Sequence, residues 1–142
     1  AMLLNKKKFK EEIYFDENFF MYLENNDLCK RVTDNEGSIF VVPTSKINHL
    51  AAKAVDSSFA EEVEYSRNWH WIWSKFYFNK KHYGLFKAVK EGTLRYFLSI
   101  LKFLFYFLIN DKVKKKIYFN RASGFYNALL GKSSWYRPRL DD

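Results

Sequence analysis

The chain has 142 residues, of which 48% are hydrophobic and 28% charged, and this balance excludes a disordered polymer and a collagen-like fibre. Its 24 Lys and Arg residues against 16 Asp and Glu leave a formal charge of +8, so the expected partners are anionic: phosphates, nucleotides, nucleic acid or acidic lipid. Aromatic residues make up 20% of the sequence, more than so short a domain easily buries, and we expect some of them to face a sugar, a membrane or another partner.

The single cysteine, Cys29, excludes an internal disulfide and a Cys-based zinc site, and it favours a reducing compartment. The apolar stretch before the first lysines is too short for a secretion signal. The longest apolar run, 94–109, contains Arg95 and Lys102 and is shorter than the roughly 20 apolar residues of a membrane-spanning helix. We expect a cytoplasmic protein, with peripheral attachment to the inner face of the plasma membrane as an open alternative.

The N-terminal part of the chain predicts one helix and one strand. Residues 24–35 place their apolar side chains on one helical face, and Gly37 is expected to end this helix in the left-handed conformation. Residues 38–43 are β-branched and aromatic and end at a proline, which predicts a short strand.

The rest of the chain is expected to be helical almost to its end, because prolines and glycines are sparse. A long helix is predicted over about 59–83, where Gly84 ends or bends it. A second helix is predicted over about 93–110, and a third over 112–130 with Asp111 as its cap. These elements predict an α+β chain that is mainly α.

Few residues have a spacing typical of catalysis. The sequence has no Gly-rich phosphate loop, no nucleophile elbow and no HExxH motif. Glu24 and Asp27 are three positions apart and share a helix face, which makes them candidates for a general base or for metal ligands. The alternative is that they cap the helix or form a solvated acidic first turn. His49, after the predicted strand, is a further candidate, although a lone His is more often structural.

Aromatic residues follow one another closely in the first long helix. Trp69 can stack on a sugar ring or a lipid acceptor, and His70 can donate to a phosphate. The alternative is that the aromatic side chains of 69–77 follow helical spacing and pack the helix onto its neighbours. Arg67 is a candidate phosphate contact, or it pairs with Glu64.

The apolar arc of residues 94–109 is followed directly by the lysines of 112–116. This combination is typical of a helix that lies in a membrane interface with its lysines on anionic headgroups. The alternative is that the arc packs against the flanking helices or against a second copy of the chain.

Four stretches together carry a resemblance to a known family. FDENFFMYLENNDLCKR (15–31), followed by a Gly and by VVPTSKINH (41–49), resembles the second half of the catalytic domain of bacterial family 2 glycosyltransferases, especially the rhamnosyltransferase-like group. SRNWHWIWSKFYFNKKHYG (66–84) and GKSSWYRP (131–138) are similar to the helical C-terminal tail of such enzymes. The resemblance covers nearly the whole chain and is specific as a whole, whereas no single motif in it is specific.

The resemblance implies inverting hexosyl or deoxyhexosyl transfer from a nucleotide sugar to a glycan or lipid-linked acceptor, in bacterial surface polysaccharide or lipopolysaccharide synthesis. It implies a divalent Mg or Mn ion, with His49 near the metal and the diphosphate. Asn25 stands where the family has the Asp that serves as general base, so that either Glu24 or Asp27 takes this role or the variant is impaired. Arg67, with Trp69 and His70, is implied on the substrate side.

The resemblance also implies short strands from the second half of a glycosyltransferase-A type fold, followed by three helices. Residues 1–56 are then the acceptor-side remnant of the catalytic domain, and residues 57–142 are the helical tail. The nucleotide-binding half and its acidic metal motif are not in the sequence, so we expect a fragment that is inactive alone and that self-associates as a homo-oligomer.

A function of another class is a basic, aromatic-rich module that binds an acidic membrane or nucleic acid. The lysines are split among 6–10, 80–90 and 112–116 and belong to no recognition motif. A specific nucleic-acid partner is therefore not expected.

Overall fold

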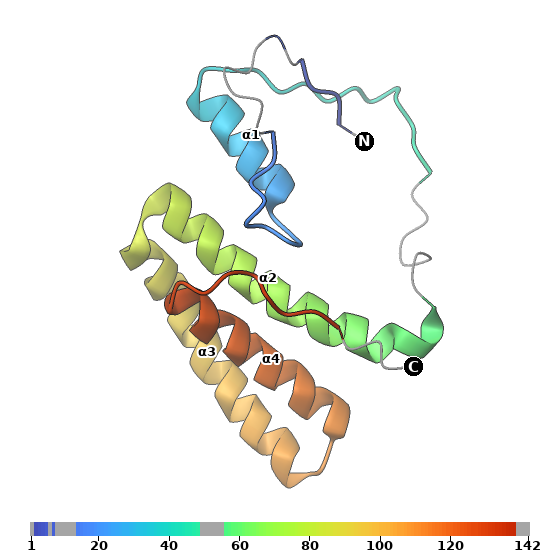
Figure 1. The fold of residues 1–142 in the computed structure, drawn as a ribbon, viewed down its shortest axis with the longest axis vertical. Coiled ribbons are helices and arrows are strands. Elements are labelled where there is room, and N and C mark those ends of the chain that lie inside the picture. Colours follow the sequence, from blue (N-terminus) through green and yellow to red (C-terminus); the bar gives the residue numbers. More distant parts are fainter. Residues whose placement is uncertain (1, 6, 8–13, 49–55, 139–142) are drawn as a thin grey trace.

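The computed structural model describes residues 2–5, 7, 14–48 and 56–138. Within these residues the elements are helices, with the bounds α1 (Glu24–Asp34), η2 (a 3-10 turn, Ser57–Phe59), α2 (Ala60–Tyr83), α3 (Leu85–Leu108) and α4 (Lys112–Leu129). Helices α2, α3 and α4 pack against one another as a bundle, while α1 lies against α2 on the side away from α3 and α4 (Figure 1). After α4 the chain turns back and runs along α2 (Figure 1).

The predicted α+β class is wrong, because residues 38–43 form no strand and the described part of the chain contains no sheet. This segment is a loop whose side chains are exposed, Phe40 to 82% and Val41 to 86% (Figure 1). Residues with high β-propensity form a strand only where a neighbouring strand takes up their backbone hydrogen bonds. The strand of a glycosyltransferase-A type fold that was expected here is therefore absent.

Helix α1 is confirmed, but its end differs from the prediction. The left-handed residue is Glu36, with φ 58°, and not Gly37. The amide of Gly37 donates to the carbonyl oxygen of Val32 at 2.8 Å, which closes the last turn. A Cβ at Gly37 would lie 2.7 Å from a methyl group of Val32, so the glycine is needed for this close approach.

The three C-terminal helices are confirmed, with one displaced boundary. Gly84, with φ 88°, turns the chain from α2 directly into α3, as its position predicts. Helix α3 begins at Leu85 and continues through Gly92, where the ring of Phe125 occupies the space of a side chain. Asp111 caps α4, because its side chain accepts the amide of Lys114 at 2.9 Å.

The core lies between α2, α3 and α4 and is largely aromatic. Its buried members are Trp69, Trp73, Phe76, Ala88, Phe125 and Ala128. Helices α2 and α4 approach closely at Gly124, where a Cβ would lie 2.5 Å from the carbonyl oxygen of Trp69.

No helix among the described residues has the length and apolarity needed to cross a bilayer. The prediction that residues 94–109 do not span a membrane is therefore confirmed.

Candidate functional site

The segment before α1 is held against the outer face of α2. Ser74 in α2 donates its hydroxyl hydrogen to the carbonyl oxygen of Met21 at 2.7 Å. The ring of Phe19 meets Tyr77 edge to face, with 4.9 Å between ring centroids. Residues 14–23 and α2, which are far apart in sequence, therefore form one surface.

The C-terminal tail packs onto the same region of α2. The Nε2 atom of His70 lies 2.8 Å from the carbonyl oxygen of Tyr136, and the hydroxyl of Ser134 donates to the carbonyl oxygen of Asn18 at 2.7 Å. Three of the four stretches that resemble glycosyltransferases, 15–31, 66–84 and 131–138, therefore meet in space. The described residues of the fourth, 41–48, are exposed.

Asp27 is completely buried where α1 meets α2, and both of its carboxylate oxygens are engaged. Oδ2 accepts from Nε of Arg31 at 2.9 Å, while Oδ1 lies 2.7 Å from Nζ of Lys81 and 2.8 Å from Nε2 of His82. Burial alone would raise the pKa of Asp27, but the hydrogen bonds from Lys81, Arg31 and His82 outweigh burial and lower it. Asp27 is thus an ionised, paired carboxylate that joins two helices, and this weakens it as a proton acceptor.

The ammonium group of Lys81 is shared with a second carboxylate, that of Asp16. Its Nζ lies 2.7 Å from Oδ2 of Asp16, and the Tyr77 hydroxyl donates to the same oxygen at 3.0 Å. Burial opposes ionisation of Asp16, but hydrogen bonds from Lys81, Asn18 and Tyr77 lower its pKa to about 2. Burial and the bond to Asp16 together raise the pKa of Tyr77 to about 12. Lys81 therefore links Asp16 and Asp27, two carboxylates of the stretch 15–31.

Glu24 follows a backbone turn with unusual geometry. Tyr22 and Leu23 both have positive φ, 70° and 68°, in the region that non-glycine residues rarely adopt. Each such residue costs on the order of 1–3 kcal/mol, and such residues concentrate at active sites and ligand clamps. The Oε2 atom of Glu24 is buried, and no described residue donates a hydrogen bond to it. Of the two predicted carboxylates, Glu24 is the one whose oxygen is not paired with a cation.

Arg67 projects from α2 beside this turn. Its Nε donates to the hydroxyl of Tyr22 at 2.9 Å, and the Tyr22 ring meets Trp71 edge to face at 5.4 Å between centroids. Nη1 of Arg67 also lies 3.6 Å from Oε2 of Glu64, so the pairing that the sequence offered as the alternative is present. The side chain of Arg67 is nonetheless 52% exposed, and Trp71 is 46% exposed. The turn before Glu24 is thus bordered by an exposed guanidinium, which suits an anionic group, and an exposed indole, which suits a sugar face. We call Tyr22, Glu24, Arg67 and Trp71 the turn site.

The sequence predicts Arg67 as a site residue but does not single out Tyr22 or Trp71. The signal for Trp71 is helical spacing: Trp69 and Trp73 are four positions apart on one face of α2, and Arg67 and Trp71 are four apart on another. No sequence signal indicated Tyr22, because its position depends on how the turn folds back onto α2.

Trp69 and His70 are both completely buried. The Trp69 ring stacks on Trp73 and on Tyr136, with 6.4 and 5.8 Å between centroids. Burial lowers the pKa of His70 and outweighs its hydrogen bond to the Tyr136 carbonyl, which acts in the other direction, while nearby Arg137 also lowers it. His70 is therefore neutral at pH 7, with its Nε2–H donating to Tyr136. This geometry fits the packing alternative, because neither side chain reaches the surface.

In the described part of the chain, no group of side chains fits the divalent metal that the resemblance implies. His49 lies outside the described residues. Among the residues that are described, no three His, Cys, Asp or Glu side chains are grouped so as to hold a metal ion. Asp16 and Asp27 are already paired with cations. We derive no step that uses a metal.

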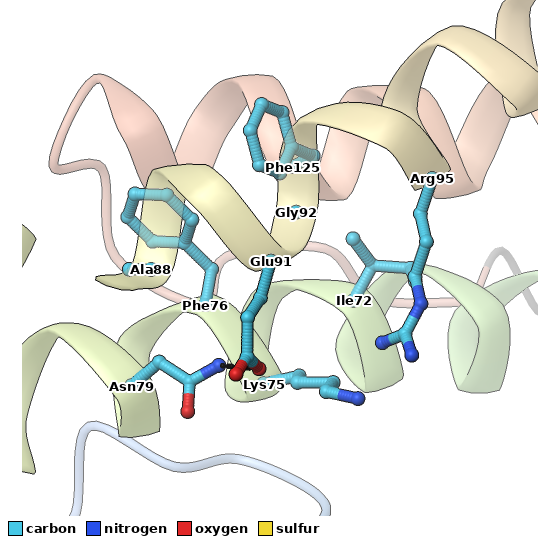
Figure 2. Close-up of a pocket in the computed structure, with 9 residues that line it drawn as sticks. All are labelled: Ile72, Lys75, Phe76, Asn79, Ala88, Glu91, Gly92, Arg95 and Phe125. Carbon is cyan, nitrogen blue, oxygen red and sulfur yellow. Dashed lines mark hydrogen bonds between the residues drawn. The ribbon is translucent and has the colours of Figure 1, made fainter. Parts of the chain in front are cut away.

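A small cavity lies between α2 and α3, with a volume of about 20 Å³ (Figure 2). Glu91 extends from α3 towards α2, where its carboxylate accepts from Nδ2 of Asn79 at 3.1 Å (Figure 2). The same carboxylate pairs with Nζ of Lys87, one turn earlier in α3, at 2.8 Å. The cavity has room for about one water molecule and is too small for a sugar.

No protein-family model matches the chain, and no curated protein or solved structure is similar enough to it to count as a match. The resemblance to glycosyltransferases therefore rests only on the sequence stretches quoted above and stays a prediction.

Proposed function

We propose that the chain forms the acceptor-side and helical-tail part of a nucleotide-sugar-dependent glycosyltransferase that builds bacterial surface polysaccharide or lipopolysaccharide. The observation that supports this most is that two family-like stretches, 15–31 and 131–138, pack on one face of α2, whose residues belong largely to a third, 66–84. The strained turn before Glu24 lies within this assembly. These stretches lie apart in the sequence, yet they pack together into one structural unit.

The turn site has the chemistry that the acceptor side of an inverting transfer requires. The acceptor hydroxyl attacks the anomeric carbon, the bond from this carbon to the nucleoside diphosphate breaks, and the hydroxyl proton passes to a base. Glu24 is the base in this proposal, because its Oε2 atom is not paired with a cation. Arg67 contacts an acceptor or donor phosphate, and Trp71 stacks on the acceptor sugar.

In this proposal Asp27 is a positioning residue and does not itself take the proton. Its bonds to Lys81 and His82 of α2 fix α1 on α2 and thereby fix the turn from which Glu24 projects, while Arg31, in α1 itself, pairs with its other oxygen. The nucleotide sugar and the Mg or Mn ion used by the family belong to the same proposal, with no residue of the described part assigned to the metal.

The test is sugar transfer from nucleotide sugars to glycan or lipid-linked acceptors by the enzyme that contains these residues. Glu24→Gln is expected to lower kcat by about 10²–10⁴-fold, the usual contribution of a general base, with an unchanged melting temperature. Trp71→Ala is expected to raise KM for the acceptor while kcat stays nearly constant. Glu17→Gln, at an exposed position before the turn, is the control and leaves both constants unchanged. A Glu24→Gln enzyme with the wild-type kcat would contradict the assignment of the base.

A further inference from the structure

Helix α3 carries a continuous apolar surface on the side that faces away from the bundle. Its buried side chains, Ala88 and Ser99, face α2 and α4. The opposite side presents large apolar side chains at helical spacing, which we call the outer stripe: Leu94, Phe97, Leu101, Leu104, Phe105 and Leu108.

Every member of the outer stripe is strongly exposed, from 49% at Leu104 to 80% at Leu108. At 1.5 Å per residue the outer stripe extends over about 21 Å of helix. No described element covers it (Figure 1). Contiguous apolar surface on this scale marks an interaction site, whereas scattered exposed apolar residues do not.

The apolar surface continues from the outer stripe towards α4. An open groove of about 370 Å³ runs between the two helices, and Leu104 of the outer stripe forms part of its wall. Phe103 and Phe119 both line the groove and contact each other, with 5.9 Å between their ring centroids. The exposed apolar area is thus wider than one face of one helix.

Positive charge is concentrated around this surface. Residues 85–116 contain eight basic and two acidic side chains, and so account for six of the eight net positive charges of the chain. Both acidic groups are already engaged, Glu91 with Lys87 at 2.8 Å and Asp111 as the cap of α4. Four lysines follow directly after the outer stripe, in what we call the lysine cluster: Lys112, Lys114, Lys115 and Lys116. Nζ of Lys114 also lies 3.6 Å from Oδ2 of Asp111.

Two members of the lysine cluster are held beside the end of α3. Nζ of Lys114 lies 5.2 Å from the centroid of the Tyr106 ring, and Nζ of Lys115 lies 5.4 Å from that of Phe107. The ammonium groups of both lysines therefore lie over aromatic rings at the end of α3. Apolar and cationic groups thus meet at one end of the bundle, as they do in helices that lie in a lipid interface.

We propose that the outer stripe and the lysine cluster form a docking surface for an anionic lipid bilayer, with α3 lying in the plane of the interface. The apolar side chains enter the acyl boundary, and the lysines contact the acidic headgroups. A second copy of the chain is a poorer occupant, because the charged rim of one copy is basic and would meet the basic rim of the other. This inference goes beyond the proposed sugar transfer and does not depend on it.

The test is co-sedimentation of the full chain with phosphatidylcholine vesicles that contain or lack phosphatidylglycerol. We expect binding to the anionic vesicles at low salt, weaker binding at high salt, and little binding to phosphatidylcholine alone. The double variant Lys112→Ala/Lys115→Ala is expected to lower the partition coefficient about 25-fold, at about fivefold per lysine. Leu101→Ser/Leu108→Ser is expected to reduce binding as well, since it removes apolar insertion.

The matched controls lie on the loop before α2. Phe40→Ser removes an equally exposed apolar side chain, and Lys46→Ala removes an exposed lysine, both away from α3. Both controls are expected to bind anionic vesicles like the wild type, and all variants are expected to keep the helical circular dichroism of the wild type. Equal binding with and without phosphatidylglycerol, or unchanged binding by Leu101→Ser/Leu108→Ser, overturns the proposal. A dimer that this double variant dissociates, with no vesicle binding by the wild type, overturns it in favour of an interface between copies.

Discussion

Asp27 is the residue at which charge, burial and position combine most strongly. Removing its negative charge leaves the partly exposed cations Lys81 and Arg31 without their common partner, although Lys81 keeps its bond to Asp16. Asp27→Asn is therefore expected to reduce the free energy of unfolding by about 1–3 kcal/mol, the usual cost of a buried hydrogen-bonded group that loses part of its partners. Urea denaturation followed by circular dichroism measures this loss.

The control for this prediction is Asp34→Asn in the same helix. Asp34 pairs with Lys30 at 2.9 Å, but its side chain is 52% exposed. An exposed pair of this kind contributes about 0–1 kcal/mol, so the control should lie close to the wild type. Equal losses at the two positions would show that the Asp27 network does not hold α1 in place.

His70 gives the protein a dependence on acid that carboxylates do not explain. Its pKa is lowered in the folded state, so below the unfolded value of about 6.5 the unfolded chain takes up a proton that folded His70 does not. The free energy of unfolding is therefore expected to fall as the pH drops below about 6.5, by at most about 1.4 kcal/mol per pH unit, until the folded pKa is reached. Asp16, with its pKa lowered to about 2, costs stability only as the pH falls below about 4.

Urea denaturation between about pH 7 and about pH 5 separates these two effects. In His70→Gln the amide can still donate to the Tyr136 carbonyl but does not titrate, so the decline over this range is expected to become shallower. A decline of the same slope in His70→Gln would assign the effect to other groups.

At the scale of the elements, the close contact between α2 and α4 depends on Gly124, which has no side chain. At Gly124 a methyl group would lie 2.5 Å from the backbone oxygen of Trp69, and backbone cannot move aside as a flexible side chain can. Gly124→Ala is therefore expected to lose about 1–3 kcal/mol of unfolding free energy, although Ala is the better helix former. Lys112→Ala, at an exposed position of the same helix, is the control and should change it by less than about 0.5 kcal/mol. A Gly124→Ala protein more stable than the wild type would mean that the helices can separate at little cost.

The elements that sequence predicts well are those whose signals are local. Gly84 and Asp111 delimit helices through their own backbone or side-chain geometry, and α2 and α4 begin and end within one residue of expectation. The strand predicted for 38–43 is wrong because a strand requires a partner that local sequence does not specify. Gly92 suggested a helix boundary, yet it lies inside α3 because Phe125 from another helix needs the space.

The same distinction applies to the candidate site. Arg67 is a candidate because of its chemistry; its side chain is exposed but pairs with Glu64, and its binding role stays a prediction. Sequence alone left open whether Trp69 and His70 bind substrate or pack. The tail that covers them arrives from 66 positions further along the chain, as the bond from His70 to Tyr136 shows. Likewise, nothing local distinguishes Glu24 from Asp27, since what separates them is the position of Lys81 on another helix.

At the scale of the whole molecule, the tail completes the core. The ring of Tyr136 stacks on Trp69, and its hydroxyl accepts from Nδ2 of Asn120 at 3.2 Å. Tyr136→Ala is expected to lower the free energy of unfolding by about 3 kcal/mol and to shift tryptophan fluorescence to the red, since it opens Trp69 to water. Lys132→Ala is the control, because only the backbone oxygen of Lys132 receives the bond from Trp73. Unchanged fluorescence in Tyr136→Ala would mean that the tail does not seal the core.

The tail also determines when the protein can finish folding. A ribosome releases the chain from its N-terminus at about 5–20 residues per second, so His70 waits roughly 3–13 s for Tyr136 to be made. Asn18 waits longer still, because its partner Ser134 follows 116 positions later. Closure of this core therefore waits until residues 134–136 have been made, and until then the nascent chain carries Trp69 without the Tyr136 ring that covers it.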